Sequence, residues 1–135
     1  MLFDDRYEES VPILEAMVYR FPDKKNYYRQ LAALYAELKR EEDSFHIQQI
    51  MFSKDMLEKH DELLRIAQLY LFYEVPYKAA LILEKELDSG RIKDEEKNWE
   101  QLANAWLSAR EWKKAIPPLK KDAEVRKQRA SKVPI

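Results

Sequence analysis

The sequence predicts an all-α fold, an α-solenoid in which about seven helices stack as antiparallel pairs. Three observations lead to this prediction. The chain repeats itself with a step of about 35 residues, small side chains recur at one position of that repeat, and the 135 residues include a single glycine. Such scarcity of glycine argues against a turn-dense all-β fold and against a glycine-rich phosphate-binding loop.

Each repeat begins with an expected helix, here called A, in which an apolar residue and an alanine are followed by an aromatic residue three positions later. The three copies are YRQLAALYAEL at 28–38, LRIAQLYLFY at 64–73 and WEQLANAWLSA at 99–109. The alanines of these copies, Ala32, Ala67 and Ala103, lie 35 and 36 residues apart. This spacing predicts amphipathic helices that bury one face.

A second expected helix, called B, follows each A helix. Its copies are EDSFHIQQIM at 42–51, YKAALILEKEL at 77–87 and KKAIPPLKKDA at 114–123, and a further copy, EESVPILEAMV at 8–18, precedes the first A helix. The small residues at the shared position, Ser10, Ser44, Ala79 and Ala115, are separated by 34, 35 and 36 residues. Small side chains at this position let the two backbones of a pair approach each other closely.

The repeats predict one domain over residues 1–135. Its parts are the B helix of an incomplete leading repeat at 1–22, and repeats at 23–59, 60–95 and 96–130, the last with a basic C-terminal helix. Local signals indicate helix ends. We expect Asp23 and Asp94 to be N-caps, Val75-Pro76 to form a turn with proline near the first helical position, and Gly90 to end a helix.

This pattern resembles the tetratricopeptide repeat, and the likeness covers about residues 8–125. The bulky first position of the family motif is held by Tyr28, Leu63 and Trp99, the late position of helix B by Leu14, Leu83 and Leu119, and the closing proline by Pro22. Two features differ from the family. The turn within each pair usually carries glycine, whereas Lys39, Glu74 and Arg110 stand here, and Gln48 replaces the usual aromatic residue of the first B helix.

Three stretches are similar to the repeat proteins found with TonB-type energy-transduction systems of Gram-negative bacteria. They are FPDKKNYYRQLAALYAEL, AQLYLFYEVPYKAALILEKEL and NWEQLANAWLSAREWKKAIPPLKK. This resemblance implies a periplasmic accessory scaffold, of which the chain is an excised piece. An engineered or redesigned sequence is the alternative, and without the TonB likeness a cytoplasmic protein is expected.

The sequence indicates no catalytic chemistry, and we expect no cofactor and no metal. Cysteine is absent, and His46 and His60 lie on different predicted elements without a spaced carboxylate cluster. The longest apolar run, LAALYA at 31–36, is far too short to span a bilayer. A formal net charge of −1 does not favour nucleic acid, although residues 111–135 carry an excess of basic side chains.

The resemblance implies a function in protein binding, because the A helices of this family line the concave side of a right-handed superhelix. The expected partner is a peptide or a helix, bound at family groove positions that are mostly amides and charges with one apolar anchor. These positions are Asn26, Arg29, Asp61, Arg65, Gln68, Phe72, Lys97, Gln101 and Asn104. The alternative is a self-associating module whose terminal helices form an oligomer interface. That alternative includes a homodimer formed through apolar residues of the N-terminal helix, namely Leu2, Phe3, Val11, Leu14 and Val18.

Overall fold

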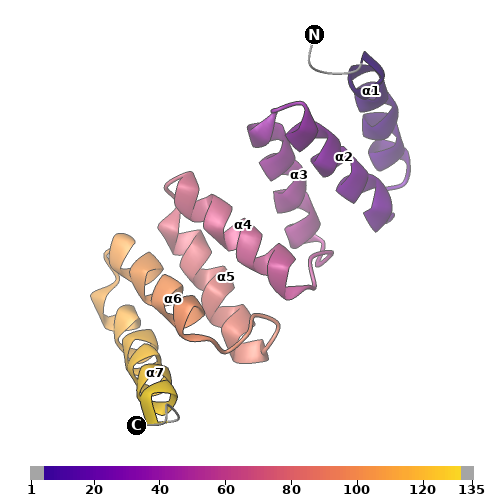
Figure 1. Cartoon of the computed structure of the whole chain (residues 1–135). Coiled ribbons are helices and arrows are strands. Elements are labelled where there is room, and N and C mark those ends of the chain that lie inside the picture. Colours follow the sequence, from indigo (N-terminus) through magenta and orange to yellow (C-terminus); the bar gives the residue numbers. More distant parts are fainter. Residues whose placement is uncertain (1–4, 132–135) are drawn as a thin grey trace. The chain divides into compact units, whose positions relative to one another are not determined.

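The computed structural model describes residues 5–131, and these residues form seven α-helices and no strand. The prediction of an all-α fold is therefore confirmed, with 80% of the structure helical. Figure 1 shows the helices in chain order. They fall into two compact units, the first ending at Leu57 and the second beginning at Glu58. That both units belong to one domain stays a prediction, and each is described here by itself.

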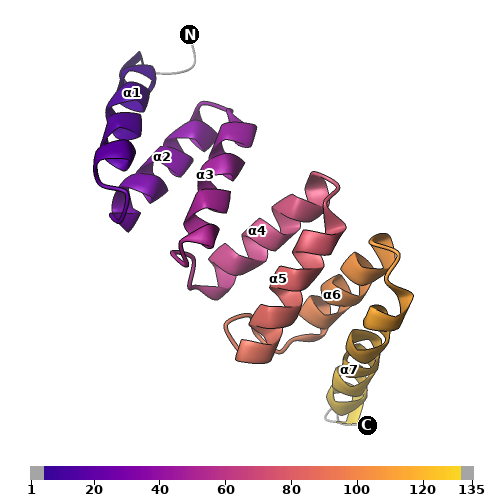
Figure 2. The same ribbon diagram turned by 180° about the vertical axis from the view of Figure 1, so that it is seen from behind.

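The first unit contains α1 (Asp5–Arg20), α2 (Lys25–Glu37) and α3 (Glu41–Ser53). Helix α2 contacts both α1 and α3, as Figure 2 shows from behind. Its buried side chains are Tyr28, Leu31 and Tyr35, which the 3.6-residue period of a helix places on one face. Three acidic residues in the first turn of α3 stabilise this helix, because negative charge interacts favourably with the positive N-terminal end of the helix dipole.

The apolar side chains of α1 lie differently from the prediction for the N-terminal helix. Val11 was expected to be uncovered, and this is wrong, since it is buried in the first unit, where α1 packs on α2. Leu14 and Val18 are half-buried, while Leu2 and Phe3 lie outside the described residues. The exposed apolar side chains of this helix are instead Tyr7, Ile13 and Tyr19.

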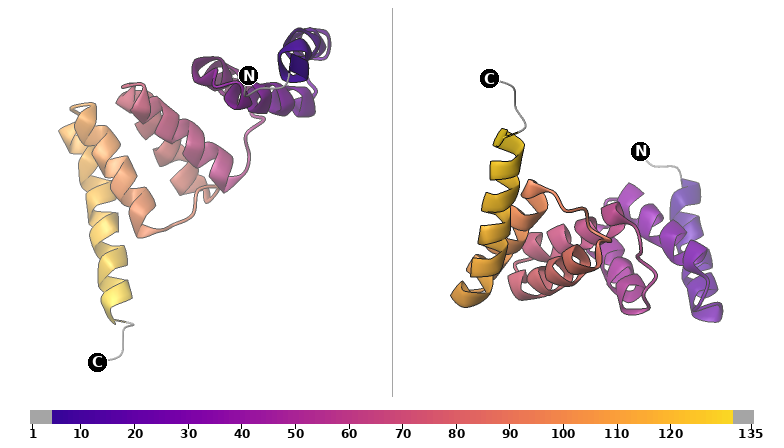
Figure 3. Two further views of the ribbon diagram at one scale, coloured as in Figure 1. Left: turned by 45° about the horizontal axis from the view of Figure 1, so that its top comes forward. Right: turned by 90° about the horizontal axis from the view of Figure 1, so that it is seen from below.

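The second unit contains α4 (His60–Phe72), α5 (Pro76–Ser89), α6 (Glu96–Ser108) and α7 (Trp112–Ser131). Each of these helices packs against the next one along the chain, and Figure 3 shows α7 beside α6. The core of this unit consists of residues at equivalent places of the repeat. Its fully buried members include Leu63, Ile66, Ala67, Ala79, Ala80, Leu83, Ile92, Ala103, Ala105, Trp106 and Ala115.

Three of the four small residues at the shared B-helix position are buried, as the sequence predicts for close helix packing, whereas Ser10 in α1 is half-buried. Ala79 in α5 and Ala115 in α7 have no exposed surface, and Ser44 in α3 is 5% exposed. The hydroxyl of Ser44 donates a hydrogen bond to the carbonyl of Ala32 in α2, with 2.9 Å between the oxygens. A side chain on α3 therefore reaches the backbone of its partner helix. This approach leaves no room for a large residue.

The turn within each helix pair has the same geometry in all three repeats, although glycine is absent from it. Lys39, Glu74 and Arg110 have φ angles of 60°, 61° and 61°. Two hydrogen bonds, from this residue and from the next, return to the end of the A helix in each case, which is the Schellman arrangement of a helix C-terminus. The hydrogen bond that spans five residues runs from the backbone N–H of Arg40 to the carbonyl of Tyr35. Its counterparts run from Val75 to Tyr70 and from Glu111 to Trp106, and the N–O distance is 2.8 Å in each case.

The helix-end signals gave mixed results. The prediction that Asp23 and Asp94 are N-caps is wrong, because the N-cap positions of α2 and α6 are the following residues, Lys24 and Glu95. Asp94 instead accepts a hydrogen bond from the indole nitrogen of Trp99. The other two predictions are confirmed. Pro76 begins α5, and Gly90 ends it with a φ of 85°.

A buried ion pair closes the connection between α5 and α6. The Glu86 carboxylate has no exposed surface, and the Arg91 guanidinium binds it from Nε at 2.5 Å and from Nη2 at 2.8 Å. The backbone N–H of Ile92 also donates to the Glu86 carbonyl. Because a buried carboxylate is stable only when it is paired, this contact fixes the path of the chain after Gly90.

Candidate partner-binding site

Four of the predicted binding residues lie along one side of α4. Asp61, Arg65, Gln68 and Phe72 are spaced by four, three and four residues, which places them one above another on a helix. All four are exposed, with 95% of the Asp61 side chain and 75% of Phe72 accessible. Phe72 is an aromatic side chain that α4 presents to solvent, although its ring also meets Tyr73 edge-on at 5.1 Å.

The predicted residues of α6 repeat this arrangement one step later. Lys97, Gln101 and Asn104 stand 36 residues after Asp61, Arg65 and Gln68. Lys97 and Asn104 are exposed, whereas Gln101 is half-buried. The amide oxygen of Gln101 is buried and accepts no hydrogen bond from a described residue.

The predicted residues of the first unit lie near the start of α2. Asn26 is exposed, and Arg29 is half-buried with a partner of its own. Gln30 occupies the place in α2 that corresponds to Arg65 in α4, since it stands 35 residues earlier, and it is exposed. The sequence prediction missed this residue. Asn26 and Gln30 also share the lining of a hollow of about 500 Å³ at this end of the helix. The step of 35 residues was the signal that could have found Gln30.

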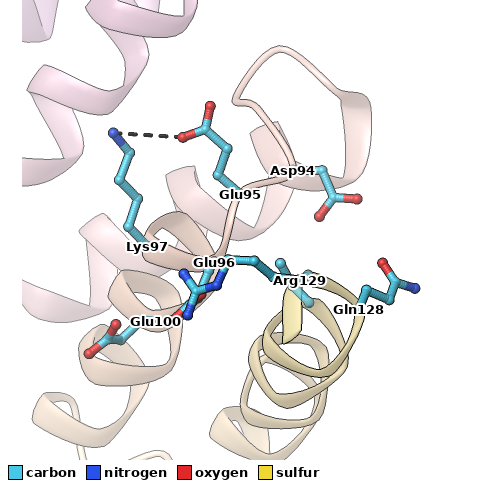
Figure 4. A pocket seen from close by; sticks show the side chains of 8 residues that line it. Asp94, Glu95, Glu96, Lys97, Glu100, Gln128 and Arg129 are labelled. Atoms are coloured by element: carbon cyan, nitrogen blue, oxygen red, sulfur yellow. Dashed lines mark ion pairs between the residues drawn. The ribbon is translucent and has the colours of Figure 1, made fainter. Parts of the chain in front are cut away.

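A hollow of about 540 Å³ lies beside the predicted residue Lys97, where the start of α6 faces the end of α7. Figure 4 shows the side chains around it, with Lys97 directed toward Glu95, 3.6 Å away. Arg129 reaches from α7 to the Glu96 carboxylate at 2.6 Å, and Arg126 approaches the same carboxylate at 2.8 Å. The acidic groups around this hollow thus have partners within the same unit, and the hollow is a junction between two helices.

Exposed polar side chains lie in line on α4 and on α6, and both of these helices belong to the second unit. Amide and charged side chains in such lines are suited to hydrogen bonds with an extended backbone or with the polar side of a helix. That all the predicted residues form one groove stays a prediction.

The histidines and acidic residues outside this surface were also compared with the geometry of metal sites. Within the described part of the chain no group of three or more histidine, cysteine, aspartate or glutamate side chains could hold a metal ion. His60 accepts a hydrogen bond on Nδ1 from the backbone N–H of Lys93 at 3.1 Å, which ties the start of α4 to the α5–α6 connection. No helix formed by residues 5–131 has the length and apolar character needed to cross a membrane.

Comparison with known proteins identifies the fold. No family model matches the chain, and no curated protein sequence matches it. The solved structure "MamA MSR-1 C2" matches with a TM-score of 0.59 and 15% identity over 91% of this chain and 69% of the other. A second structure, "MamA RS-1 ArsTM double mutant", matches with a TM-score of 0.58 and 14% identity over 93% and 68%. MamA contains tetratricopeptide repeats, and the chain therefore has a TPR-like helical repeat fold.

Proposed function

We propose that the protein is a non-enzymatic scaffold that binds a peptide or a partner helix along the exposed sides of its A helices. The observation that supports this proposal most is that α4 and α6 carry polar residues at the same three places of the repeat. Positions 61, 65 and 68 and their counterparts 97, 101 and 104 are polar on both helices, while neighbouring positions are packed in the core. Core positions recur because packing requires them, whereas packing does not require the outer polar positions to recur.

Phe72 supplies the apolar anchor of this surface. An aromatic side chain of this size covers about 150–250 Å² when it is fully enclosed by a partner. Burying it contributes about 1.5–3 kcal/mol, which is a factor of roughly ten to a hundred in affinity. Arg65 lies two turns earlier on the same side and adds charge-assisted hydrogen bonds to a carboxylate or a carbonyl of the partner.

We propose the periplasm of a Gram-negative bacterium as the site of action and a TonB-type system as the context. The support is the likeness of three stretches of sequence, described above, to repeat proteins of such systems. A scaffold of this kind fits the mostly polar surface of α4 and α6, since transient partners are held by polar contacts around a few apolar anchors.

Affinity capture from a Gram-negative envelope extract tests the proposal. The immobilised chain is compared with Arg65→Glu/Phe72→Ala and with a matched control, Lys85→Glu/Leu81→Ala, which changes one charge and one exposed apolar residue on α5. We expect the unchanged chain and the control to retain proteins that the Arg65→Glu/Phe72→Ala variant loses. Circular dichroism should show the same helical content for all three chains. Equal retention by all three would place the binding site elsewhere.

The identity of the retained proteins tests the cellular context separately. Enrichment of TonB-system components supports the periplasmic proposal. If a parallel capture from the soluble cytoplasmic fraction alone yields proteins that depend on Arg65 and Phe72, the binding surface stands and the TonB context is wrong.

A further inference from the structure

His60, the first residue of α4, is bound to the connection between α5 and α6. Its Nδ1 accepts a hydrogen bond from the backbone N–H of Lys93, with 3.1 Å between the two nitrogens. The two residues lie 33 positions apart in the sequence, so this contact joins the start of α4 to the segment that leads into α6. All of these elements belong to the second unit.

The rest of the connection is bound to the two helices that it joins. The backbone N–H of Ile92 donates to the carbonyl of Glu86 in α5 at 3.0 Å, and Nδ2 of Asn98 in α6 donates to the carbonyl of Lys93 at 2.8 Å. Ile92 and Asn98 have no exposed surface. Lys93 is therefore held through its carbonyl by α6 and through its N–H by α4, and the second of these bonds reaches a helix that the connection does not join.

The hydrogen bond between His60 and Lys93 requires the neutral form of the imidazole. A neutral ring has one N–H and one bare nitrogen, and since Nδ1 accepts here, the ring proton lies on Nε2. A second proton goes to Nδ1, and both ring nitrogens are then donors. Two N–H groups would face each other across this contact, so the hydrogen bond is lost. Imidazole side chains ordinarily change charge between about pH 5 and 8.

The surroundings of the ring leave it open to a proton from solvent. The His60 side chain is 18% exposed, and its Nε2 lies 3.9 Å from the carboxylate of Asp61, whose own side chain is 95% exposed. The other charged side chains of the adjoining segments are Glu58, Lys59 and Glu62 beside His60 in the sequence, Glu86 and Arg91, which pair with each other, and the exposed Asp88, Lys93 and Asp94. A positive ring thus has a carboxylate beside one nitrogen and loses its backbone partner at the other.

We propose that His60 makes the packing of the α5–α6 connection on α4 sensitive to pH. The neutral ring holds the Lys93 N–H, and the protonated ring releases it, so that the connection is then held by α5 and α6 alone. The bond links the helix starts that carry Asp61 and Lys97, the first residues of the two polar lines. Acid therefore loosens the coupling between the starts of these two helices. The proposal concerns this hydrogen bond and holds whether or not the two lines bind a partner.

The chain offers a matched control because it contains only two histidines. The other one, His46, is exposed on α3 in the first unit, and His46→Asn removes it. His60→Asn keeps an acceptor oxygen near the place of Nδ1 but does not gain a proton in this range. His60→Phe keeps a ring and removes the acceptor. Circular dichroism at each pH shows whether the helical content of the variants equals that of the unchanged chain.

Nitrogen-15 NMR of the full chain between pH 5 and 8 tests the proposal by following the ring nitrogens of His60 and the amide of Lys93. We expect the Nε2–H tautomer at pH 8. The Lys93 amide resonance should then move with the midpoint of the His60 ring, in the unchanged chain and in His46→Asn, and stay nearly constant in His60→Asn.

Hydrogen exchange of the Lys93 amide gives a second measurement. At pH 5 the unchanged chain should exchange this proton roughly two- to tenfold faster than His60→Asn at the same pH, which is the net value of one hydrogen bond. At pH 8 the unchanged chain should protect it by the same factor relative to His60→Phe. Comparing chains at one pH removes the effect of pH on the intrinsic exchange rate.

Four results would overturn the proposal. The first is a neutral ring that carries its proton on Nδ1 at pH 8, and the second is a ring that gains no proton down to pH 5. The third is a Lys93 amide resonance that stays constant while the His60 ring titrates, or that still moves in His60→Asn. The fourth is a His60→Phe chain in which the Lys93 amide is as well protected at pH 8 as in the unchanged chain.

Discussion

Glycine at the three pair turns should stabilise the protein. Lys39, Glu74 and Arg110 adopt left-handed backbone angles, and their side chains are exposed. The left-handed region places Cβ too close to the carbonyl oxygen, and this costs an L-residue roughly 1–2 kcal/mol. Glycine has no such penalty at these φ angles.

The magnitude follows from two opposing terms. Relief of strain gains roughly 1–2 kcal/mol per turn, and the greater freedom of glycine in the unfolded chain returns roughly 0.5–1 kcal/mol. We therefore expect Lys39→Gly, Glu74→Gly and Arg110→Gly each to raise the free energy of unfolding by about 0.5–1 kcal/mol. The three turns lie 35 and 36 residues apart in the sequence, and with additive effects the triple variant should gain about 1.5–3 kcal/mol.

Urea unfolding followed by far-UV circular dichroism measures this gain, which should appear as a higher midpoint with an unchanged slope. Lys85→Gly is the matched control, because it places glycine at an exposed interior position of α5 and should destabilise by about 1 kcal/mol. The reasoning would be refuted by turn variants that lose stability as the control does. That result would mean the side chains at these turns contribute more than their strain.

Three other changes test features of single sites. Arg91→Met leaves the buried Glu86 carboxylate without its ion-pair partner and should lower the free energy of unfolding by about 3 kcal/mol, measured by urea unfolding. Gly90→Ala should cost about 1–2 kcal/mol through its φ of 85°, since a Cβ at this position meets no atom within 4 Å. Burial and then the nearby Glu15 carboxylate raise the pKa of Tyr35, so the folded state holds this proton more tightly than the unfolded state. Its contribution to stability is therefore complete below pH of about 10 and declines above it, and Tyr35→Phe should reduce the loss of stability in alkaline urea titrations.

Sequence periodicity located the helices well because packing imposes it. The recurring aromatic residues Tyr35, Tyr70 and Trp106 are buried, and the observed helices α2, α4 and α6 extend a few residues before the segments predicted from them. Helix caps were predicted poorly. Asp23 and Asp94 each lie one position too early, and a carboxylate near a helix start is equally able to bind a neighbouring indole, as Asp94 binds Trp99.

The exposure of the terminal helices could not be predicted from the repeat alone. Periodicity shows which positions face the neighbouring helices, but which of them are covered depends on packing in three dimensions. Val11 is thus buried against expectation, whereas Ile13 on the same helix is exposed. The ion pair of Glu86 and Arg91 was also missed, because two charged residues five positions apart give no sign of burial in a sequence so rich in charge.

Site-specific photo-crosslinking tests the proposed binding surface most directly. A photoreactive phenylalanine analogue is placed at position 68 on α4, at 104 on α6, or at the exposed position 85 on α5 as the control, and each chain is irradiated in an envelope extract. The surface predicts that positions 68 and 104 capture the same protein and that position 85 does not. Capture of that protein with equal yield at position 85, or of unrelated proteins at 68 and 104, would contradict it.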